Sequence, residues 1–440
     1  YQVGNNDQET KDFINALAGN FLTILFLFTA LVLLITPVFI LIFAPGFYFD
    51  DYKREISVDV LRIMFPYLAL ISLVAFAGGI QNTHNRFSLP AFTPLIFNAC
   101  LIFAALIIAP KYDIPIYVLA WGVLTAGFVQ LVIQLFPLKQ IDRLPIPKFD
   151  LNNQGTRKVF KLIIPAILAG GIMQINLLID TIFASLLQTG SPTWLYVSDR
   201  LIQFPMGIFA IAIGTVLLPT LSKIDISKDI NGFIDIVKKG QRFVLFIGIP
   251  SFIGLALCST DILSTIFLRG EFKAYDVNQA SLSLIAFSFG LPFFMLMKVL
   301  TPAFFARKDT KTPMYIALLS LFLNAFLNYI LAFVLNYGHI GIAIGSSISA
   351  FVSVIILELI LVQQGIVNLY NPFNRFNFSI LIPSLVVIAF LFFLSEHISF
   401  LQLSMINKIL VLSLKVFISI GIYLSLSRLI YGKPLKEIFN

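Results

Sequence analysis

The sequence predicts an all-α protein that crosses a membrane many times, and three observations support this fold class. Of the 440 residues, 58% are hydrophobic and only 12% are charged, which leaves too little polar surface to cover a water-soluble protein. Apolar runs of about 20 residues, the length that crosses the hydrocarbon core, recur along the chain. Lysine and arginine gather in alternate connections between these runs. The net charge of +8 therefore follows membrane topology and does not indicate a nucleic-acid partner.

Twelve apolar segments are long enough to span the bilayer as helices. They are Phe13–Phe43, Val58–Ile80, Ala91–Ala109, Ile116–Leu138, Phe160–Leu187, Trp194–Leu221, Phe243–Phe267, Ala280–Phe305, Met314–Leu335, Gly341–Gln363, Phe378–Leu394 and Ile409–Leu429. The basic connections are residues 139–161, 223–242 and 307–311, together with the C-terminal tail. By the positive-inside rule we expect these connections, and both ends of this chain, on the cytoplasmic side.

An internal repeat relates two stretches of the chain. The run from Ile42 to Gly46 resembles the run from Ile266 to Gly270, and residues 82–90 parallel residues 306–313. The two copies are about 224 positions apart and six predicted helices apart, so they share one topology. They should be related by an axis along the membrane normal, as in transporters built from parallel repeats. The alternative is a chance likeness between segments rich in phenylalanine and glycine.

The repeat predicts a domain organisation. Two helices precede the matching segment in the later copy, so we expect two further helices before Tyr1 and fourteen in the complete protein. The domains predicted in this way are an N-terminal lobe at 1–140 that lacks its first two helices, a cytoplasmic linker at 141–160, a C-terminal lobe at 161–365 and two additional transmembrane helices at 366–440.

Three charged residues lie close together in depth near the outer surface. Asp199 and Arg200 begin one predicted helix, and Asp180 lies near the end of the preceding one. At 1.5 Å per residue, Asp180 is about 10 Å and Arg200 about 9 Å from the outer ends of their helices. Charged residues inside the bilayer are rare and usually functional. We expect Arg200 to bind a phosphate or diphosphate through its guanidinium fork; the alternative is a structural ion pair with Asp180 or Asp199.

A set of oxygen-bearing side chains is predicted at a depth near that of Asp180. Asn324 and Asn328 share one helix face, about 15 and 21 Å from the inner end, and Ser346 lies about 8 Å below the outer surface. One carboxylate, two amides and a hydroxyl suit a hard cation such as Na⁺. The alternative is hydrogen bonding between helices without an ion.

The remaining polar residues of the predicted helices point to no catalytic site. Lys298 is expected either to extend to the cytoplasmic surface or to guard the inner mouth of a cavity against an anionic substrate. Glu358 and Lys415 are expected to be cavity-edge or snorkelling residues without a role. The two cysteines and three histidines, which include His339, show no disulfide or metal-ligand spacing.

Several runs of the chain resemble the MurJ (MviN) family of lipid II flippases, in order and over nearly the whole length. They include the segments 65–75, 79–98, 119–122, 130–135, 180–185, 198–207 and 298–313. The segment from Ser198 to Gly207 reads Ser-Asp-Arg-Leu-Ile-Gln-Phe-Pro-Met-Gly, and hydropathy alone would not dictate such a run.

The resemblance implies an exporter fold of the multidrug/oligosaccharidyl-lipid/polysaccharide type, with two helical lobes around a central cavity and two extra helices. It implies transfer of lipid II, an undecaprenyl-diphosphate-linked disaccharide-pentapeptide, to the outer leaflet of a bacterial inner membrane by alternating access. Such a protein is a transporter without catalytic residues, and its partners would be membrane lipids and the peptidoglycan synthesis machinery. The last two helices would form a groove for the lipid tail.

The resemblance also implies residue roles. Arg200 matches an essential cavity arginine for which diphosphate binding is implied, with Asp199 orienting it. Lys298 is expected to join them in substrate binding if it guards the inner mouth, a role that rests on its place in the helix. Asp180, Asn324, Asn328 and Ser346 fall where some members hold sodium. Asn328 stands where some members have a carboxylate, so the site here is less anionic and sodium binding is less favoured. The resemblance implies no cofactor other than possible Na⁺. The family's other essential arginines belong to the two helices expected before Tyr1.

Two rival functions are compatible with parts of this pattern. A related exporter would carry other lipid-linked oligosaccharides or drugs by cation antiport. An enzyme acting on polyprenyl phosphates, such as a glycosyltransferase, would need a carboxylate cluster on a loop, and none of the predicted loops carries one.

Overall fold

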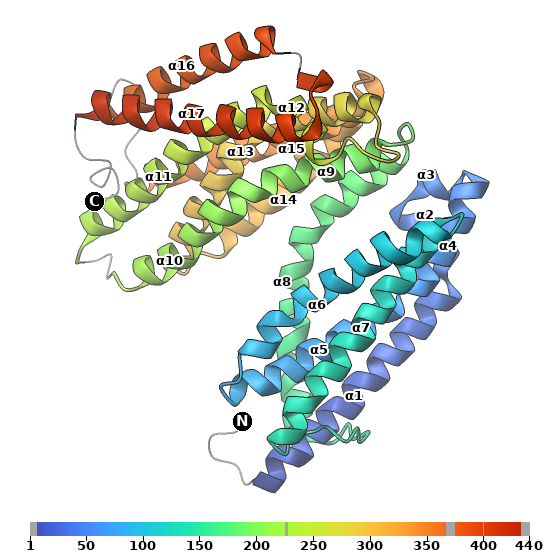
Figure 1. Ribbon diagram of the computed structural model, residues 1–440. Helices are drawn as coiled ribbons and strands as arrows, with labels where there is room; N and C mark the ends of the chain where they lie inside the picture. The colour runs from blue at the N-terminus through green and yellow to red at the C-terminus, as the bar shows by residue number, and fades with distance from the viewer. Residues whose placement is uncertain (1–6, 225–227, 367–374, 399, 433–440) are drawn as a thin grey trace. The chain divides into compact units, whose positions relative to one another are not determined.

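The computed structural model describes residues 7–224, 228–366, 375–398 and 400–432, and within these ranges the side chains of 162, 164–173 and 375 are left out. The basic C-terminal tail assigned above to the cytoplasmic side lies partly outside the described residues. In the described ranges the chain forms helices and no strand, apart from an isolated bridge between Arg269 and Phe272. The all-α fold class is confirmed (Figure 1).

The chain divides into two compact units, Tyr1–Gln174 and Ile175–Asn440. The helices of the first unit are α1 (Asp7–Leu34), α2 (Thr36–Phe43), α3 (Pro45–Tyr48), α4 (Asp51–Met64), α5 (Pro66–Thr83), α6 (Ser88–Phe103) and α7 (Pro115–Gln140). Two short turns follow α6, a π-helix η1 (Ala104–Ile108) and a 3₁₀ helix η2 (Ala109–Lys111). Helix α8 (Gln154–Ser185) begins in the first unit and ends in the second. The domain boundaries predicted from the sequence stay predictions.

The second unit contains the remaining helices. They are α9 (Ser191–Pro205), η3 (Met206–Ala210), α10 (Ile211–Ser222), α11 (Ile230–Leu257), α12 (Ser259–Ile266), α13 (Ala274–Ala306), α14 (Lys311–Tyr329), η4 (Ile330–Val334), α15 (Gly338–Gln363), α16 (Arg375–His397), η5 (Phe400–Gln402) and α17 (Met405–Tyr431).

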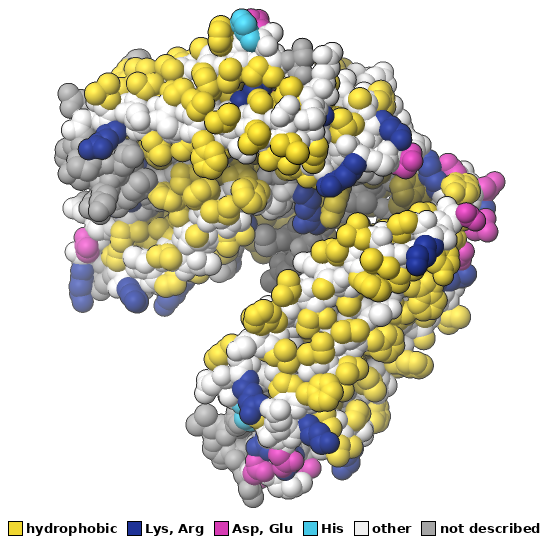
Figure 2. All heavy atoms as spheres, viewed as in Figure 1, with side chains coloured by type: hydrophobic (Ala, Val, Ile, Leu, Met, Phe, Trp, Pro, Cys, Tyr) yellow, Lys and Arg dark blue, Asp and Glu magenta, His cyan; other side chains and the backbone are white. Residues whose placement is uncertain are grey.

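Eleven helical segments of the described chain are long and apolar enough to cross a membrane. They coincide with eleven of the twelve predicted spans, and α8 occupies the place of the remaining one; the total of twelve stays a prediction. Figure 2 shows hydrophobic side chains over the sides of the helices and charged side chains gathered toward the helix ends of the first unit. This distribution is expected where the helix sides face lipid, and the chain is a multi-pass membrane protein.

The internal repeat is confirmed at the level of secondary structure. Helix α1 and helix α11 begin 223 positions apart, at Asp7 and Ile230, and they also end 223 positions apart. The same shift relates α2 to α12, α4–α5 to α13, and α7 to α15, and the starts of α6 and α14. Even the turns correspond, because Asn85 and Lys308 both adopt left-handed backbone, with φ of 58° and 61°.

The turn between α13 and α14 illustrates how such ends are stabilised. The Asp309 carboxylate accepts hydrogen bonds from the Thr312 hydroxyl at 2.7 Å and from the Thr312 backbone N–H at 3.0 Å. These bonds satisfy a donor of the first turn of α14 that has no partner within the helix. They also hold the pKa of Asp309 below its ordinary value.

Helix α13 is the centre of the second unit. In the most apolar stretch of α13, 61% of the residues are buried inside the protein. In that of α17 only 11% are buried, so most of the surface of α17 faces lipid. Small residues permit close approach to α13: a Cβ added at Gly248 of α11 would lie 3.3 Å from Pro292. In lipid such close packing, together with hydrogen bonds between helices, replaces the hydrophobic driving force.

The structure corrects the expectation for Lys415. The Lys415 ammonium lies 2.5 Å from the Asp261 carboxylate, with side-chain exposures of 3% and 14%, and 5.3 Å from the centre of the Phe400 ring. It therefore does not extend to the membrane surface. A charge in this position needs a partner inside the protein, and the ion pair joins α17 to α12. Sequence reasoning missed it because its members are separated by 154 positions.

Replacing Lys415 tests this ion pair. Lys415→Met leaves the Asp261 carboxylate buried without a partner, and we expect a loss of about 3–5 kcal/mol in stability. The double variant Lys415→Met/Asp261→Leu removes both charges and should recover most of that loss. Thermal unfolding of the purified protein in one detergent measures both. Equal instability of the single and double variants would contradict the buried pair.

Candidate functional site

Four side chains form a closed ring of hydrogen bonds in the second unit. The Asn328 amide donates to Asp180 at 2.6 Å and to the Asn324 carbonyl oxygen at 3.1 Å. The Asn324 amide donates to the Ser346 hydroxyl at 2.9 Å, and that hydroxyl donates to the second Asp180 oxygen at 3.3 Å. The structure therefore brings together all four residues that the sequence predicted to share a depth.

The local fold explains how the ring forms. Asn324 and Asn328 lie one turn apart on the same face of α14, and both are buried. Gly345 precedes Ser346 on α15, and a Cβ at this position would collide with the Asn328 side-chain oxygen. Glycine at 345 therefore lets the two helices approach closely enough for the hydrogen bonds. Helix α8 then adds Asp180 to the ring.

One atom of the ring has no hydrogen-bond partner. The Asn328 side-chain oxygen is buried and accepts no hydrogen bond from the described residues. A buried polar atom without a partner is costly. Carboxylate, amide and hydroxyl oxygens together provide a donor set that fits a small monovalent cation.

The corresponding place in the first unit is apolar. Positions 223 before Asn324, Asn328 and Ser346 hold Leu101, Ala105 and Val123. These three line an apolar pocket of about 380 Å³ between α4, α6 and α7. The two units share a helical framework, but within the described residues this oxygen set occurs in the second alone.

Asp199 and Arg200 lie on the part of α9 that is not packed against α13. Trp194 and Ser198 form the packed face: the Trp194 indole donates to Asp276 at 2.9 Å, and the Ser198 hydroxyl donates to the Ala280 carbonyl at 2.8 Å. Both are buried, whereas Arg200 is exposed.

The Arg200 guanidinium lies over the Tyr196 ring, 4.8 Å from its centre. Asp199 accepts a hydrogen bond from Gln203 at 3.4 Å. Among the described residues no ion pair joins Arg200 to Asp199 or Asp180, the alternative raised by the sequence. The guanidinium donors are thus not committed to an internal carboxylate, which suits the binding of an external anion.

Lys298 is half-buried in α13, where a Cβ at Gly214 of α10 would come within 3.3 Å of its carbonyl oxygen. No described residue forms a hydrogen bond or ion pair with its ammonium. The structure does not bring Lys298 into contact with the ring or with Arg200, and its two alternative roles stay predictions.

His339 is a polar residue whose position the sequence did not reveal. It is buried in the first turn of α15. Its ring contacts Ser283 at 2.6 Å and Gln279 at 3.0 Å and packs against Trp194, with ring centres 4.8 Å apart. The signal that could have found this cluster is that Trp194 begins one predicted helix and His339 lies two residues before another, Gly341–Gln363.

Comparison with known proteins identifies relatives. The family model described as lipid II flippase MurJ matches residues 1–410. A protein of Vibrio cholerae, described as a probable lipid II flippase MurJ, is 38% identical over 376 residues, covering 84% of this chain and 71% of that protein.

Two solved structures resemble the fold. One, described as lipid II flippase MurJ in an inward closed conformation, matches with a TM-score of 0.79 and 26% identity, over 97% of this chain and 85% of that one. The other, an inward-facing multidrug resistance transporter of the MATE family and MOP superfamily, matches with a TM-score of 0.61 and 12% identity, over 81% and 85%. The latter similarity concerns the fold alone.

The ring makes a graded prediction. Asn328→Ala removes the 2.6 Å and 3.1 Å hydrogen bonds, whereas Ser346→Ala removes the 2.9 Å bond from Asn324 and the longer 3.3 Å bond to Asp180 but leaves the bonds of Asn328 in place. We expect Asn328→Ala to lower stability by about 1–3 kcal/mol and Ser346→Ala by less. Thermal unfolding in detergent at constant sodium concentration provides the measurement. A larger loss for Ser346→Ala would show that the ring is not arranged as described.

Proposed function

Because this chain belongs to the lipid II flippase MurJ family, we propose that it moves lipid II from the inner to the outer leaflet of a bacterial inner membrane. It would do so by alternating access, as a transporter and not as an enzyme. The observation that carries this proposal is the family match over nearly the whole chain. The exposed, ion-pair-free Arg200 supports it at the level of a single residue.

Arg200 supplies the chemistry that a lipid diphosphate needs. A guanidinium presents parallel N–H donors whose spacing matches two phosphate oxygens, and it stays protonated at every physiological pH. Tyr196 lies beneath the guanidinium plane and restricts its orientation. Asp199, the neighbouring residue, accepts a hydrogen bond from Gln203. Its negative charge would partly offset that of Arg200 and so would weaken diphosphate binding enough for release. Binding that is strong in one state and weaker in the other is what biases a transport cycle.

The proposed role of Arg200 is tested by two substitutions. Arg200→Ala removes charge-assisted hydrogen bonds worth about 1.5–3 kcal/mol in all, so lipid II affinity should fall about 10- to 100-fold. Arg200→Lys keeps the charge but loses the planar fork and should bind with intermediate affinity. Binding is measured with purified protein, and function by complementation in cells that depend on the complete protein for peptidoglycan synthesis.

Arg269→Ala serves as the matched control because Arg269 is an exposed arginine whose guanidinium bonds the Ile266 carbonyl. It should behave as the wild type. Full complementation by Arg200→Ala would refute the assigned role. Loss of the complete protein should make lipid II accumulate in the inner leaflet; a related exporter of other lipids or of drugs would not produce that accumulation.

The ring of Asp180, Asn324, Asn328 and Ser346 is the proposed site of a coupling cation, with Na⁺ favoured by its oxygen donors. The unpartnered Asn328 oxygen supports this role. A bound cation would neutralise the Asp180 carboxylate and would replace hydrogen bonds that now hold α8 to α14 and α15. Cation binding would therefore weaken the packing of α8 on α14 and α15, and this packing would in turn oppose cation binding.

Sodium dependence is predicted to follow the charge of the ring. In the wild type, Na⁺ should raise the unfolding temperature relative to equal concentrations of K⁺ or choline. Asp180→Asn should abolish that difference, because the carboxylate is lost. Asn328→Asp adds a second carboxylate and should shift the stabilisation to lower Na⁺ concentration. Equal unfolding temperatures in Na⁺ and K⁺ for both the wild type and Asn328→Asp would exclude sodium binding at the ring.

A further inference from the structure

The segment that joins α7 to α8 lies along α1 in an extended conformation. Its sequence, Leu144-Pro-Ile-Pro-Lys-Phe-Asp150, alternates prolines with residues that retain a backbone N–H. Proline fixes φ near −65° and has no donor, so the run favours extended backbone and lacks backbone donors at Pro145 and Pro147. We refer to residues 144–153 as the strap.

Three backbone donors of the strap bond to α1. The Ile146 N–H donates to the Asn15 side-chain oxygen at 2.8 Å, and the Lys148 N–H donates to the Asn15 carbonyl at 3.0 Å. The Asp150 N–H donates to the Asn20 side-chain oxygen at 3.0 Å, and the Asn20 amide donates back to the Asp150 carbonyl at 2.5 Å. Asn20 is 1% exposed, so this reciprocal pair is shielded from water.

Gly19 makes the approach of the strap possible. A Cβ built on Gly19 would collide with the carbonyl carbon, oxygen and nitrogen of Lys148, which are backbone atoms that cannot turn aside. Glycine inside a helix is less favourable than alanine by about 1 kcal/mol, so its presence here has a structural reason. A second contact follows at the start of α8, where a Cβ at Gly155 would meet the Phe13 ring at 2.6 Å.

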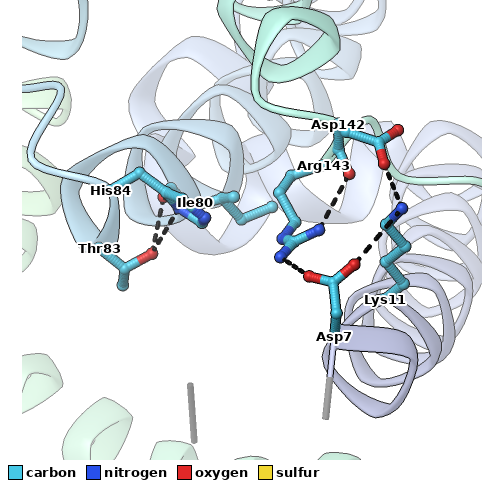
Figure 3. Close-up of polar contacts among 7 residues, drawn as sticks. All are labelled: Asp7, Lys11, Ile80, Thr83, His84, Asp142 and Arg143. Atoms are coloured by element: carbon cyan, nitrogen blue, oxygen red, sulfur yellow. Dashed lines mark hydrogen bonds and ion pairs between the residues drawn. The ribbon is translucent and has the colours of Figure 1, made fainter. Parts of the chain in front are cut away.

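An ionic network fixes the beginning of the strap. Arg143 pairs with Asp7, and Lys11 pairs with both Asp142 and Asp7, the last at 3.7 Å. Figure 3 shows these four side chains in an alternating arrangement of charge between α1 and the end of α7. Asp142 adopts left-handed backbone with φ of 53°, which turns the chain out of α7 into the strap.

The described residues of the second unit do not carry the side chains that hold the strap in the first. Positions 223 later than Asp7, Lys11 and Arg143 hold Ile230, Ile234 and Ile366, and the positions of Gly19 and Asn20 hold Arg242 and Phe243. Ile366 is buried in the apolar core. The residues that correspond to 144–151 in the second unit lie outside the described ranges, so the comparison concerns the side chains that hold the strap.

We propose that Gly19 and Asn20 are positioning residues for transport: they fix the strap on α1, so that α1 and the inner part of α8 move as one body. Helix α8 begins at Gln154, directly after the strap, so the docked strap fixes the start of α8 on α1. This inference rests on the proposed transport function, but it does not depend on which lipid is carried.

The first arm of the test asks whether the strap is docked. Gly19→Ala should release it and raise trypsin cleavage at Arg143 and Lys148 about tenfold in the purified complete protein. Gly79→Ala is the matched control, because Gly79 lies inside α5 and a Cβ there meets no atom within 4 Å. Unchanged cleavage in Gly19→Ala would overturn the docking.

The second arm asks whether docking matters for transport. In vesicles, Gly19→Ala should slow lipid II translocation about tenfold while its affinity for lipid II stays within twofold of the wild type. A released strap with an unchanged translocation rate would overturn the positioning role. So would equal losses of affinity and rate, which indicate general damage. If the wild type binds lipid II but does not translocate it, the proposed function fails instead.

Further variants cover a Gly19→Ala protein that does not fold. Asn20→Ala leaves the Asp150 backbone groups without partners and should give the same pattern, more weakly. Asp7→Arg should release the start of the strap, and Asp7→Arg/Arg143→Asp should restore both protease resistance and translocation. If the exchanged pair restores neither protease resistance nor translocation, the ionic network does not hold the strap.

Discussion

The requirement that polar groups inside a bilayer satisfy one another governs this structure more than any other constraint. No water is available in the hydrocarbon core to hydrate a carboxylate or an amide, so Asp180 is held by Asn328 and Ser346, and Lys415 by Asp261. Each of these contacts fixes one helix on another: α8 on α14 and α15 in the first case, α17 on α12 in the second. Polar contacts therefore specify helix packing here, where apolar contact alone would not distinguish protein from lipid.

The two units use one helical framework for different tasks. At the place where α14 and α15 carry the oxygen ring, α6, η1 and α7 have Leu101, Ala105 and Val123 around an apolar pocket. Where the strap lies, the two units differ in the opposite way. The first unit has the ionic network around Lys11, and the corresponding positions of the second unit hold isoleucines such as Ile366. A change of side chains at fixed helix positions is enough to achieve this, because the backbone hydrogen bonds of a helix do not depend on sequence. The asymmetry places a candidate ion site in one unit and a docked strap in the other.

Sequence reasoning succeeded where periodicity and depth decide the outcome. The spans follow from hydropathy, and Asp180, Asn324, Asn328 and Ser346 could be brought together from helix rise alone because all lie in neighbouring segments of regular structure. It did not succeed for contacts that depend on the lateral order of helices. Nothing in the depth of Lys415 or Asp261 shows that α17 packs on α12, and the burial of His339 depends on Trp194 from another helix. The sequence indicates only that the strap belongs to a basic linker. Its prolines predict extended backbone, but they do not show against which helix it lies.

Arg200 differs from the other charged residues of the second unit discussed above. Asp180, Asp261 and Lys415 are held by hydrogen bonds or an ion pair with protein groups, whereas the guanidinium of Arg200 lies over the Tyr196 ring and forms no ion pair with a described residue. An arginine could have been neutralised by Asp199, its neighbour in sequence, but successive residues of a helix point about 100° apart and do not face each other. Adjacent positions in the sequence suggest an ion pair between Asp199 and Arg200, but in a helix the two side chains point in different directions. The guanidinium is oriented by Tyr196 and exposed, an arrangement that suits an anionic ligand.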